Sequence, residues 1–286
     1  MVALSTLSPA DERRGQRRRR KKAPFSAVGE RPNRRSLAIS VGATLFFLAA
    51  WYAICRLGLV PPLFLPPPDA VVRQFLAVAI DGFSDATLLQ HAASSLLRIT
   101  LGFIIAFSIA VPLGLAMGLN RWVKGIFDPA IEFYWPIPPL AYLPLVIIWL
   151  GIGEVAKIAI IALAMFAPLV ISAQAGVRSV SVGLVQAALS LGATRRQLFW
   201  HVVLPGALPE ILTGVRIAVG AGWSTLVAAE LVAATRGLGF MTLSASEFLV
   251  TDVVFVGIFT IAALALGFVF AVRALERWLT PWKGRD

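Results

Sequence analysis

Few residues of this chain are of the types that carry out covalent or metal chemistry. The 286 residues include two histidines, His91 and His201, which lie far apart, and one cysteine, Cys55. The sequence contains no cluster of cysteines or carboxylates with metal-ligand spacing, and no recognisable serine, histidine and aspartate grouping. A single cysteine also excludes an intramolecular disulfide. The sequence therefore predicts a chain that is not an enzyme and binds no metal.

Four ionisable residues lie within or beside strongly apolar stretches: Arg98, Glu132, Arg216 and Glu230. A charge inside a bilayer is costly, so such residues face a cavity or a partner and suggest function. Glu230 follows Arg216 by fourteen residues, which is about 21 Å along one helix, so these two cannot pair within that helix. Arg98 starts its apolar stretch and is expected to extend its guanidinium to the membrane interface.

Two roles are open for each charge in the fifth apolar stretch. Glu230 lies near the expected outer end, where it would either gate the path of a solute or cap the end of a neighbouring helix. Arg216 lies toward the expected cytoplasmic half, where a structural ion pair is favoured over contact with a substrate. Neutral hydrogen-bond donors that suit a polar solute are Tyr134, Trp135, Tyr142, Trp223, Ser224 and Thr225. For any single one of these donors, packing or an interfacial position is the favoured role.

The apolar stretches that must position these residues are long enough to cross a bilayer. Hydrophobic residues make up 58% of the chain and charged residues 14%, which is too little polar surface for a soluble domain of this length. About 20 apolar residues cross the hydrocarbon core as a helix. We therefore expect an all-α polytopic membrane protein with six transmembrane helices, at about residues 37–57, 96–118, 127–150, 156–176, 211–232 and 253–274.

Prolines interrupt the third expected span. Pro136, Pro138, Pro139 and Pro144 fall within residues 127–150, and each removes a backbone donor from the helix. Backbone groups freed at membrane depth are tolerated where they are buried in protein or line a wet cavity. The sequence therefore predicts a broken or kinked span that lines a transport path.

Glycines and prolines also mark two neighbouring segments. Gly114 and Gly118 form a G-x-x-x-G step in a long helix expected over residues 91–120, which predicts a close helix contact with an unidentified partner. Five prolines over residues 58–70 predict an extended loop. A short amphipathic helix is expected from Asp69 onward.

Positive charges are concentrated on one side of this arrangement. Residues 1–36 hold eleven lysines and arginines against three acidic residues. With both termini inside, the inner segments also carry Arg121, Lys124, Arg178, Arg195, Arg196, Arg277, Lys283 and Arg285, whereas the outer loops carry Arg73 and Arg236. This bias is typical of cytoplasmic loops. We therefore expect both termini in the cytoplasm and a disordered basic tail over 1–36, a reading favoured over a nucleic-acid-binding tail.

The most informative stretch joins the fourth and fifth expected spans on the cytoplasmic side. It reads Gln186-Ala187-Ala188, three residues, Gly192, and later Val202-Val203-Leu204-Pro205. Small side chains let a short helix seat in a groove of a partner, and glycine permits the sharp turn that docks it. Pro205 is expected to stop the second helix of the stretch. The chain contains no G-x-x-x-x-G-K-[ST] segment, so a nucleotide that drives it binds to another chain.

This stretch resembles the EAA motif of importer-type ABC permeases, with Gln186 in place of the usual glutamate. From about residue 60 to the end, the chain resembles the nitrate/sulfonate/taurine permease family. Segments that carry the resemblance include Pro136–Pro144, Pro205–Gly214 and Gly222–Leu231. The resemblance implies a type I ABC importer permease fold. It also implies that Gln186, Ala187, Ala188, Gly192, Leu204 and Pro205 couple the chain to an ATPase.

The resemblance also implies what the assembly does and contains. The expected function is import of taurine or a similar small sulfonate across the bacterial inner membrane by alternating access. The expected partners are a second copy of this chain, two copies of a cytoplasmic ATPase and a periplasmic solute-binding protein. ATP and magnesium would be bound by the ATPase, and this chain would bind no cofactor.

Two alternatives to this function are kept open. The same machine would carry nitrate, bicarbonate or alkanesulfonates, or the chain would be a stand-alone secondary transporter. The second alternative predicts paired ionisable residues at mid-membrane and no docking helix.

The expected translocation path and domain organisation follow. The path would involve Glu132, Trp135, Pro136, Pro138, Pro139, Tyr142, Arg216, Trp223, Ser224, Thr225 and Glu230. The expected organisation is a tail over 1–36, the first span and an outer loop over 37–90, a permease core over 91–277 with its coupling helix at about 183–205, and a short tail over 278–286.

Overall fold

The computed structural model describes residues 34–281. Nearly all of the expected basic tail, and residues 282–286 of the expected C-terminal tail, lie outside this described part. Within residues 34–281 the chain is helical and forms no β-strand, apart from one isolated bridge between Phe83 and Ala86. The chain divides into two compact units after Leu57, and each unit is considered by itself.

The first unit contains helix α2 (Arg34–Arg56). Its Ala38–Arg56 part is long and apolar enough to cross a membrane, because it consists mostly of aliphatic and aromatic residues and carries a single charge, at its end. This helix corresponds to the first expected span.

The second unit contains four continuous helical runs of membrane length. They are α4 (Leu88–Leu119), α7 (Glu154–Ser179), α12 (Thr251–Leu279) and a long run from Arg195 to Val232. The long run joins α9 (Arg195–Leu198), a π-helical turn η1 (Phe199–Val203) and α10 (Leu204–Ala233). Each of these runs contains one of the predicted spans.

The predicted third span is a bent pair of helices. Helices α5 (Arg121–Tyr134) and α6 (Pro139–Leu150) meet at an angle of 105°. The break falls at the prolines from which it was predicted, since Pro136 and Pro138 lie between the two helices. The described part therefore contains five helices of membrane length, or six spans when the bent pair is counted as one.

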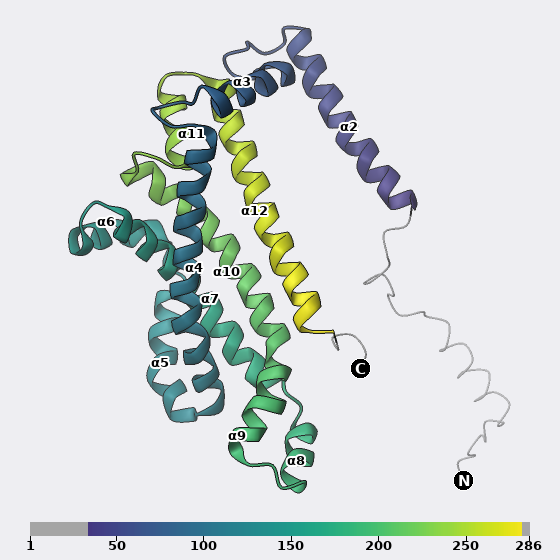
Figure 1. The fold of residues 1–286 in the computed structure, drawn as a ribbon, viewed down its shortest axis with the longest axis vertical. Helices are drawn as coiled ribbons and strands as arrows, with labels where there is room; N and C mark the ends of the chain where they lie inside the picture. Colours follow the sequence, from purple (N-terminus) through teal and green to yellow (C-terminus); the bar gives the residue numbers. More distant parts are fainter. Residues whose placement is uncertain (1–33, 282–286) are drawn as a thin grey trace, which may run out of the picture. The chain divides into compact units, whose positions relative to one another are not determined.

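The core of the second unit is built around α7, which packs extensively against α4 and α10 (Figure 1). Glycines bring these backbones together. A Cβ added at Gly114 of α4 would lie 2.4 Å from the carbonyl oxygen of Val170, and one at Gly214 of α10 would lie 2.2 Å from Cβ of Ser172. The close helix contact predicted from Gly114 and Gly118 is thus confirmed, and its partner is α7 of the same chain.

Short helices occupy the two ends of the second unit (Figure 1). Helices α3 (Pro68–Ile80) and α11 (Leu238–Glu247) lie at one end, and α8 (Val182–Ser190) lies with α9 at the other. The predicted short helix after Asp69 is confirmed as α3. The loop predicted to continue to residue 70 ends earlier, because a proline is tolerated in the first turn of a helix and α3 begins at Pro68.

Candidate functional site

Helix α8 is short but well terminated. The hydroxyl of Ser181 accepts a hydrogen bond from the amide of Leu184 at its start. At its end, the amide of Gly192 donates to the carbonyl of Leu189, and the next amide, of Ala193, donates to the carbonyl of Ala188, both at 3.0 Å. This pair of bonds is the Schellman motif, which needs a left-handed residue. Gly192 supplies it with φ +82°.

The chain turns back almost immediately after α8. Helix α9 begins at a capping box in which Thr194 and Gln197 each accept from the other's backbone amide. It then continues through η1, where the amide of Leu204 donates to the carbonyl of Phe199 five residues earlier. Two independent end signals, one on each side of Ala193, therefore fix the turn between α8 and the long helix.

The prediction that Pro205 stops a helix is wrong. The helical run continues from Arg195 to Val232 without a break. Pro205 lies in the first turn of α10, where its missing amide is tolerated, and the wider π turn directly before it changes the hydrogen-bond spacing. The stretch is therefore a short helix, α8, joined by a sharp turn to a long membrane helix. We refer to α8 and its C-cap residue Leu191 as the lever.

The lever carries apolar side chains that this chain leaves exposed. No residue of α8 is buried. Leu191 is 89% exposed, and the other exposed apolar side chains of this segment are Val182, Leu184 and Leu189. Trp200 of η1 is exposed as well. Gln186, Ala187 and Gly192 are exposed and Ala188 is half-buried, whereas Leu204 and Pro205 are half-buried at the base of α10. An exposed apolar surface of this kind is typical of a site for a partner protein.

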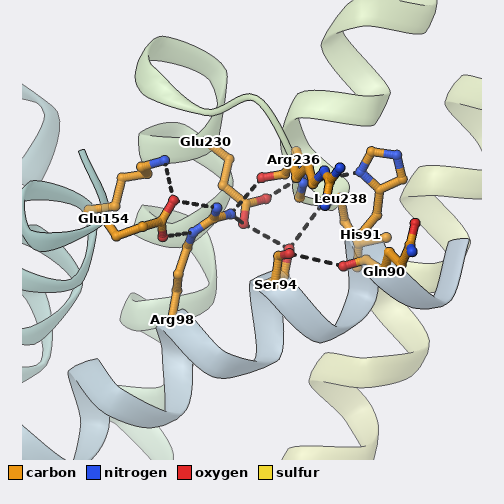
Figure 2. Close-up of polar contacts among 12 residues, drawn as sticks. Gln90, His91, Ser94, Arg98, Glu154, Glu230, Arg236 and Leu238 are labelled. Carbon is orange, nitrogen blue, oxygen red and sulfur yellow. Dashed lines mark hydrogen bonds and ion pairs between the residues drawn. The ribbon is translucent and has the colours of Figure 1, made fainter. Parts of the chain in front are cut away.

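At the opposite end of the unit, α4 presents three polar residues on one face. His91, Ser95 and Arg98 recur at spacings of four and three residues, so they share one side of the helix. All three are buried, and Arg98 is only 3% exposed. Buried polar groups of this kind require hydrogen-bond partners, and Figure 2 shows partners of these residues on other helices and on the loop before α11.

Arg98 lies between two carboxylates (Figure 2). Its Nε and Nη2 donate to the two oxygens of Glu154 at 2.6 and 2.8 Å, and its Nη1 donates to Oε1 of Glu230 at 2.6 Å. Nη1 also donates to the carbonyl of Arg236 at 2.7 Å. The prediction that Arg98 reaches the membrane interface is therefore wrong, because carboxylates from α7 and α10 hold it inside the protein.

Glu230 caps a neighbouring helix, which is one of the two roles left open for it. Its Oε2 accepts a hydrogen bond of 2.8 Å from the amide of Gly239 in the first turn of α11. The two preceding amides are also satisfied by side chains. The amide of Leu238 donates to Oγ of Ser95 at 2.9 Å, and the amide of Gly237 donates to Nδ1 of His91 at 3.1 Å. A carboxylate at a helix N-terminus also interacts favourably with the helix dipole.

The remaining bonds close this polar cluster. The hydroxyl of Ser95 donates to Oε1 of Glu230 at 2.8 Å, and Nε2 of His91 donates to the carbonyl of Phe83 at 2.9 Å. Nζ of Lys157 donates to Glu154 at 2.7 Å. Two cations and two carboxylates thus balance: Arg98, Lys157 and Glu230 are buried, whereas the Glu154 side chain is 54% exposed. Buried charges require such opposite partners. The cluster ties α4, α7 and α10 to the start of α11.

Arg98 and Glu230 were singled out from the sequence but were not paired with each other, although one local pattern points to this cluster. The contacts that join α4 to α7, to α10 and to the segment at the start of α11 connect residues separated by 56 to 146 positions, and no local pattern encodes such pairs. The spacing of His91, Ser95 and Arg98 on one face of an apolar helix does show that α4 has a polar partner.

Comparisons with known proteins agree with this architecture. Residues 100–282 match the family described as binding-protein-dependent transport system inner membrane component. The chain belongs to this family. The taurine transport system permease protein TauC of Escherichia coli K12 is 56% identical over 88% of this chain and 92% of its own length. The putative aliphatic sulfonates transport permease protein SsuC of the same organism is 40% identical over 82% and 88%.

A solved structure shows the same fold. A chain of the MetNI methionine ABC transporter, in an inward-facing conformation, superposes with a TM-score of 0.59. It covers 68% of this chain and 96% of that chain at 20% identity. The predicted fold, an all-α ABC importer permease, is therefore confirmed.

In this binding-protein-dependent permease, the residues predicted for the translocation path separate into two groups. Trp223, Thr225 and Glu230 are buried in the chain's own core. In contrast, Glu132, Trp135, Pro136, Pro138 and Ser224 are exposed, and Pro139, Tyr142 and Arg216 are half-buried. Their role in transport stays a prediction. The exposed group lies on α10 and around the bend between α5 and α6.

Two half-buried residues of this permease have polar partners within the chain. The hydroxyl of Tyr142 lies 2.9 Å from that of Tyr134, which donates to the carbonyl of Leu163 at 2.7 Å. This pair links both halves of the broken span to α7. Arg216 forms an ion pair with Glu276 of α12, which is the structural pairing that was favoured for it.

Proposed function

We propose that this chain is the membrane permease subunit of an ATP-driven importer that carries taurine into the cell. The observation that carries the proposal is its 56% identity with a taurine transport permease over 88% of the chain. The absence of a nucleotide-binding motif from the sequence and the exposed apolar lever formed by α8 support an energy source on another chain. This chain itself would carry out no covalent reaction.

The proposed assembly contains two permeases, two cytoplasmic ATPases and a periplasmic binding protein. The ATPase would contact α8 through Leu184, Leu189 and Leu191, which are exposed in this chain. ATP and magnesium would be bound by the ATPase, in keeping with the lack of a P-loop in this sequence. The chain would lie in the inner membrane with both termini in the cytoplasm, as the distribution of its positive charges favours.

The geometry suggests how closure of the ATPases would reach the membrane. Movement of α8 would pass through the turn at Gly192 into the long helix that starts at Arg195. That helix packs against α7, and α7 packs against α4. The three helices would therefore move together and alternately open the path to the two sides of the membrane.

The proposed path lies along surfaces that this chain leaves uncovered. On α10, Ile217, Gly220 and Ser224 are exposed at spacings of three and four residues, and so share one face. The bent span between α5 and α6 exposes Trp135 and Pro136. Taurine is a zwitterion that carries both a sulfonate and an ammonium group. A path lined by neutral hydrogen-bond donors and without a strong fixed charge suits it, because a strong fixed charge would trap it.

Alkanesulfonates and bicarbonate are the second candidates for the substrate. The aliphatic sulfonate permease SsuC is 40% identical to this chain, and the bicarbonate permease CmpB of Synechococcus elongatus is 31% identical over 85% of it. Taurine is preferred because the identity with the taurine permease is substantially higher.

Reconstituted transport tests the proposal. The permease, its cognate ATPase and its cognate binding protein would be placed in liposomes, and taurine uptake and ATP hydrolysis measured together. We expect taurine to stimulate both. Stimulation by an alkanesulfonate or bicarbonate, but not by taurine, would contradict the substrate. Taurine uptake that persists without ATP would contradict the ATP-driven mechanism.

A further inference from the structure

A second charged site lies at the C-terminal end of α12. A cavity of about 320 Å³ is lined there by Arg216 of α10 together with Arg273, Glu276, Arg277 and Thr280. Three arginines and one glutamate give this cavity an excess of positive charge. The cavity shares no residue with the polar cluster around Arg98 or with the lever formed by α8.

The arginines of this cavity have hydrogen-bond donors without a partner among the described residues. Arg216 pairs with Glu276, but its Nε is buried and has no hydrogen-bond partner among the described residues. Arg273 and Arg277 are exposed and form no ion pair within residues 34–281, although Arg273 lies 5.9 Å from the centre of the Phe270 ring. A buried donor without an acceptor is unfavourable. An anion with several oxygen atoms would satisfy these groups together.

An exposed apolar stripe leads along α12 to the same arginines. Leu266, Phe270, Arg273 and Arg277 follow one another at spacings of four, three and four residues, so they lie on one face of the helix. Leu266 is 56% exposed and Phe270 is 60% exposed. Half of the hydrocarbon core is about 15 Å thick, which corresponds to about ten helical residues. From Arg273, this distance includes both apolar residues.

We propose that this site binds the phosphate group of an anionic phospholipid. Arg216, Arg273 and Arg277 would hold the phosphate oxygens, because guanidinium groups match phosphate in a bidentate manner. An acyl chain would lie against Phe270 and Leu266. A basic pocket between membrane helices with an adjoining apolar face fits a lipid headgroup and its chain together, whereas a free phosphate would use only the pocket.

Lipid retention by the intact permease tests this site. Wild type and the variant Arg273→Gln/Arg277→Gln would be placed in nanodiscs of phosphatidylcholine and phosphatidylglycerol, and bound lipid counted by native mass spectrometry. We expect the wild type to retain phosphatidylglycerol selectively and the variant to bind it roughly 30-fold more weakly. The control Arg121→Gln/Arg178→Gln removes two exposed arginines outside the cavity and should bind like the wild type.

Three results of this experiment would overturn the lipid site. They are equal retention by the wild type and the Arg273/Arg277 variant, equal loss in the control variant, and displacement of the lipid by millimolar inorganic phosphate. The last result would assign the pocket to a free anion. The variant Arg273→Lys/Arg277→Lys keeps both charges, so it carries the test if the glutamine variant does not fold. We expect this lysine variant to bind with intermediate affinity, and wild-type affinity would contradict bidentate recognition.

A photo-reactive residue tests whether lipid or protein covers the exposed apolar stripe at Leu266 and Phe270. Benzoylphenylalanine in place of Phe270 should cross-link to phospholipid in the assembled transporter. Cross-linking to a second permease or to the ATPase would show that protein covers this face, and would overturn the assignment of an acyl chain.

Discussion

The two ends of the long helical run that contains α10 differ in how far the chain itself satisfies their polar groups and covers their apolar side chains. At its C-terminal end, Glu230 belongs to a closed cluster in which the charged groups and the first amides of α11 have partners. At its N-terminal end, the lever formed by α8 has satisfied backbone ends but exposes Leu184, Leu189 and Leu191. The difference indicates a division of labour. One end fixes helices within the chain, and the other offers a surface to a different protein.

Removal of the central cation should have the largest effect on stability. Arg98→Ala would leave Glu230, which is 1% exposed, without its cation, and breaking a buried pair typically costs about 3–5 kcal/mol. We expect a large drop in the thermal unfolding temperature of the purified permease. Arg73→Ala is the matched control, since Arg73 pairs with Asp69 at a similar distance of 2.7 Å on the surface, where ion pairs contribute little. Equal effects of the two variants would contradict a stabilising role for burial in this cluster.

Loss of one hydroxyl should have the next largest effect. Ser95→Ala removes the acceptor for the amide of Leu238 and a donor to Glu230, and an unsatisfied buried group costs about 1–3 kcal/mol. Ser94→Ala is the control, because among residues 34–281 the hydroxyl of Ser94 bonds only to the Gln90 carbonyl of its own helix. Hydrogen exchange should show faster opening at the start of α11 in the first variant alone. Unchanged exchange there would contradict the capping role.

A smaller effect on stability, but a clear one on function, is expected at Gly192. Gly192→Ala places a side chain at φ +82°, a conformation that costs an L-residue about 1–2 kcal/mol. Gly183→Ala is the control, because Gly183 lies inside α8 and a Cβ there meets no atom within 4 Å. We expect the first variant to reduce substrate-stimulated ATP hydrolysis and the second to preserve it. Equal ATP hydrolysis by both would show that the turn does not position α8.

The smallest effect on stability is expected on the exposed surface of the lever. Leu191→Asp changes a side chain that is 89% exposed, so the unfolding temperature should stay the same while binding of the purified ATPase weakens. Leu89→Asp, which alters a side chain that is 76% exposed at the start of α4, should leave ATPase binding unchanged. Undiminished binding to the Leu191 variant would place the ATPase elsewhere on the permease.

Local patterns predicted the features that depend on neighbouring residues. Apolar runs located the spans, the prolines at 136 and 138 located the break in the third span, and Gly192 marked the turn after α8. The position of Pro205 misled because the same residue ends one helix or begins another. Here a π turn precedes Pro205 and the helical run continues through it.

Contacts between distant segments could not be predicted from one sequence. The burial of Arg98 depends on Glu154 and Glu230, which lie 56 and 132 residues away. The local sequence at the end of a span is the same whether the arginine there is solvated by water or paired with two carboxylates. Likewise, the G-x-x-x-G step at Gly114 predicted a close contact but could not identify α7 as its partner.

The glycine contacts of α7 restrict how this unit can deform. At Gly114 the backbone of α4 lies directly against the carbonyl of Val170 in α7, and at Gly214 the backbone of α10 lies against the small side chain of Ser172. Shear between packed helices ordinarily proceeds by small adjustments of interlocking side chains, and the direct contact at Gly114 leaves little room for such adjustment at that point. We therefore expect helices α4, α7 and α10 to move largely as one body. Large displacements must be taken up at its boundaries, by hinging at the bend between α5 and α6 or at the π turn below α10.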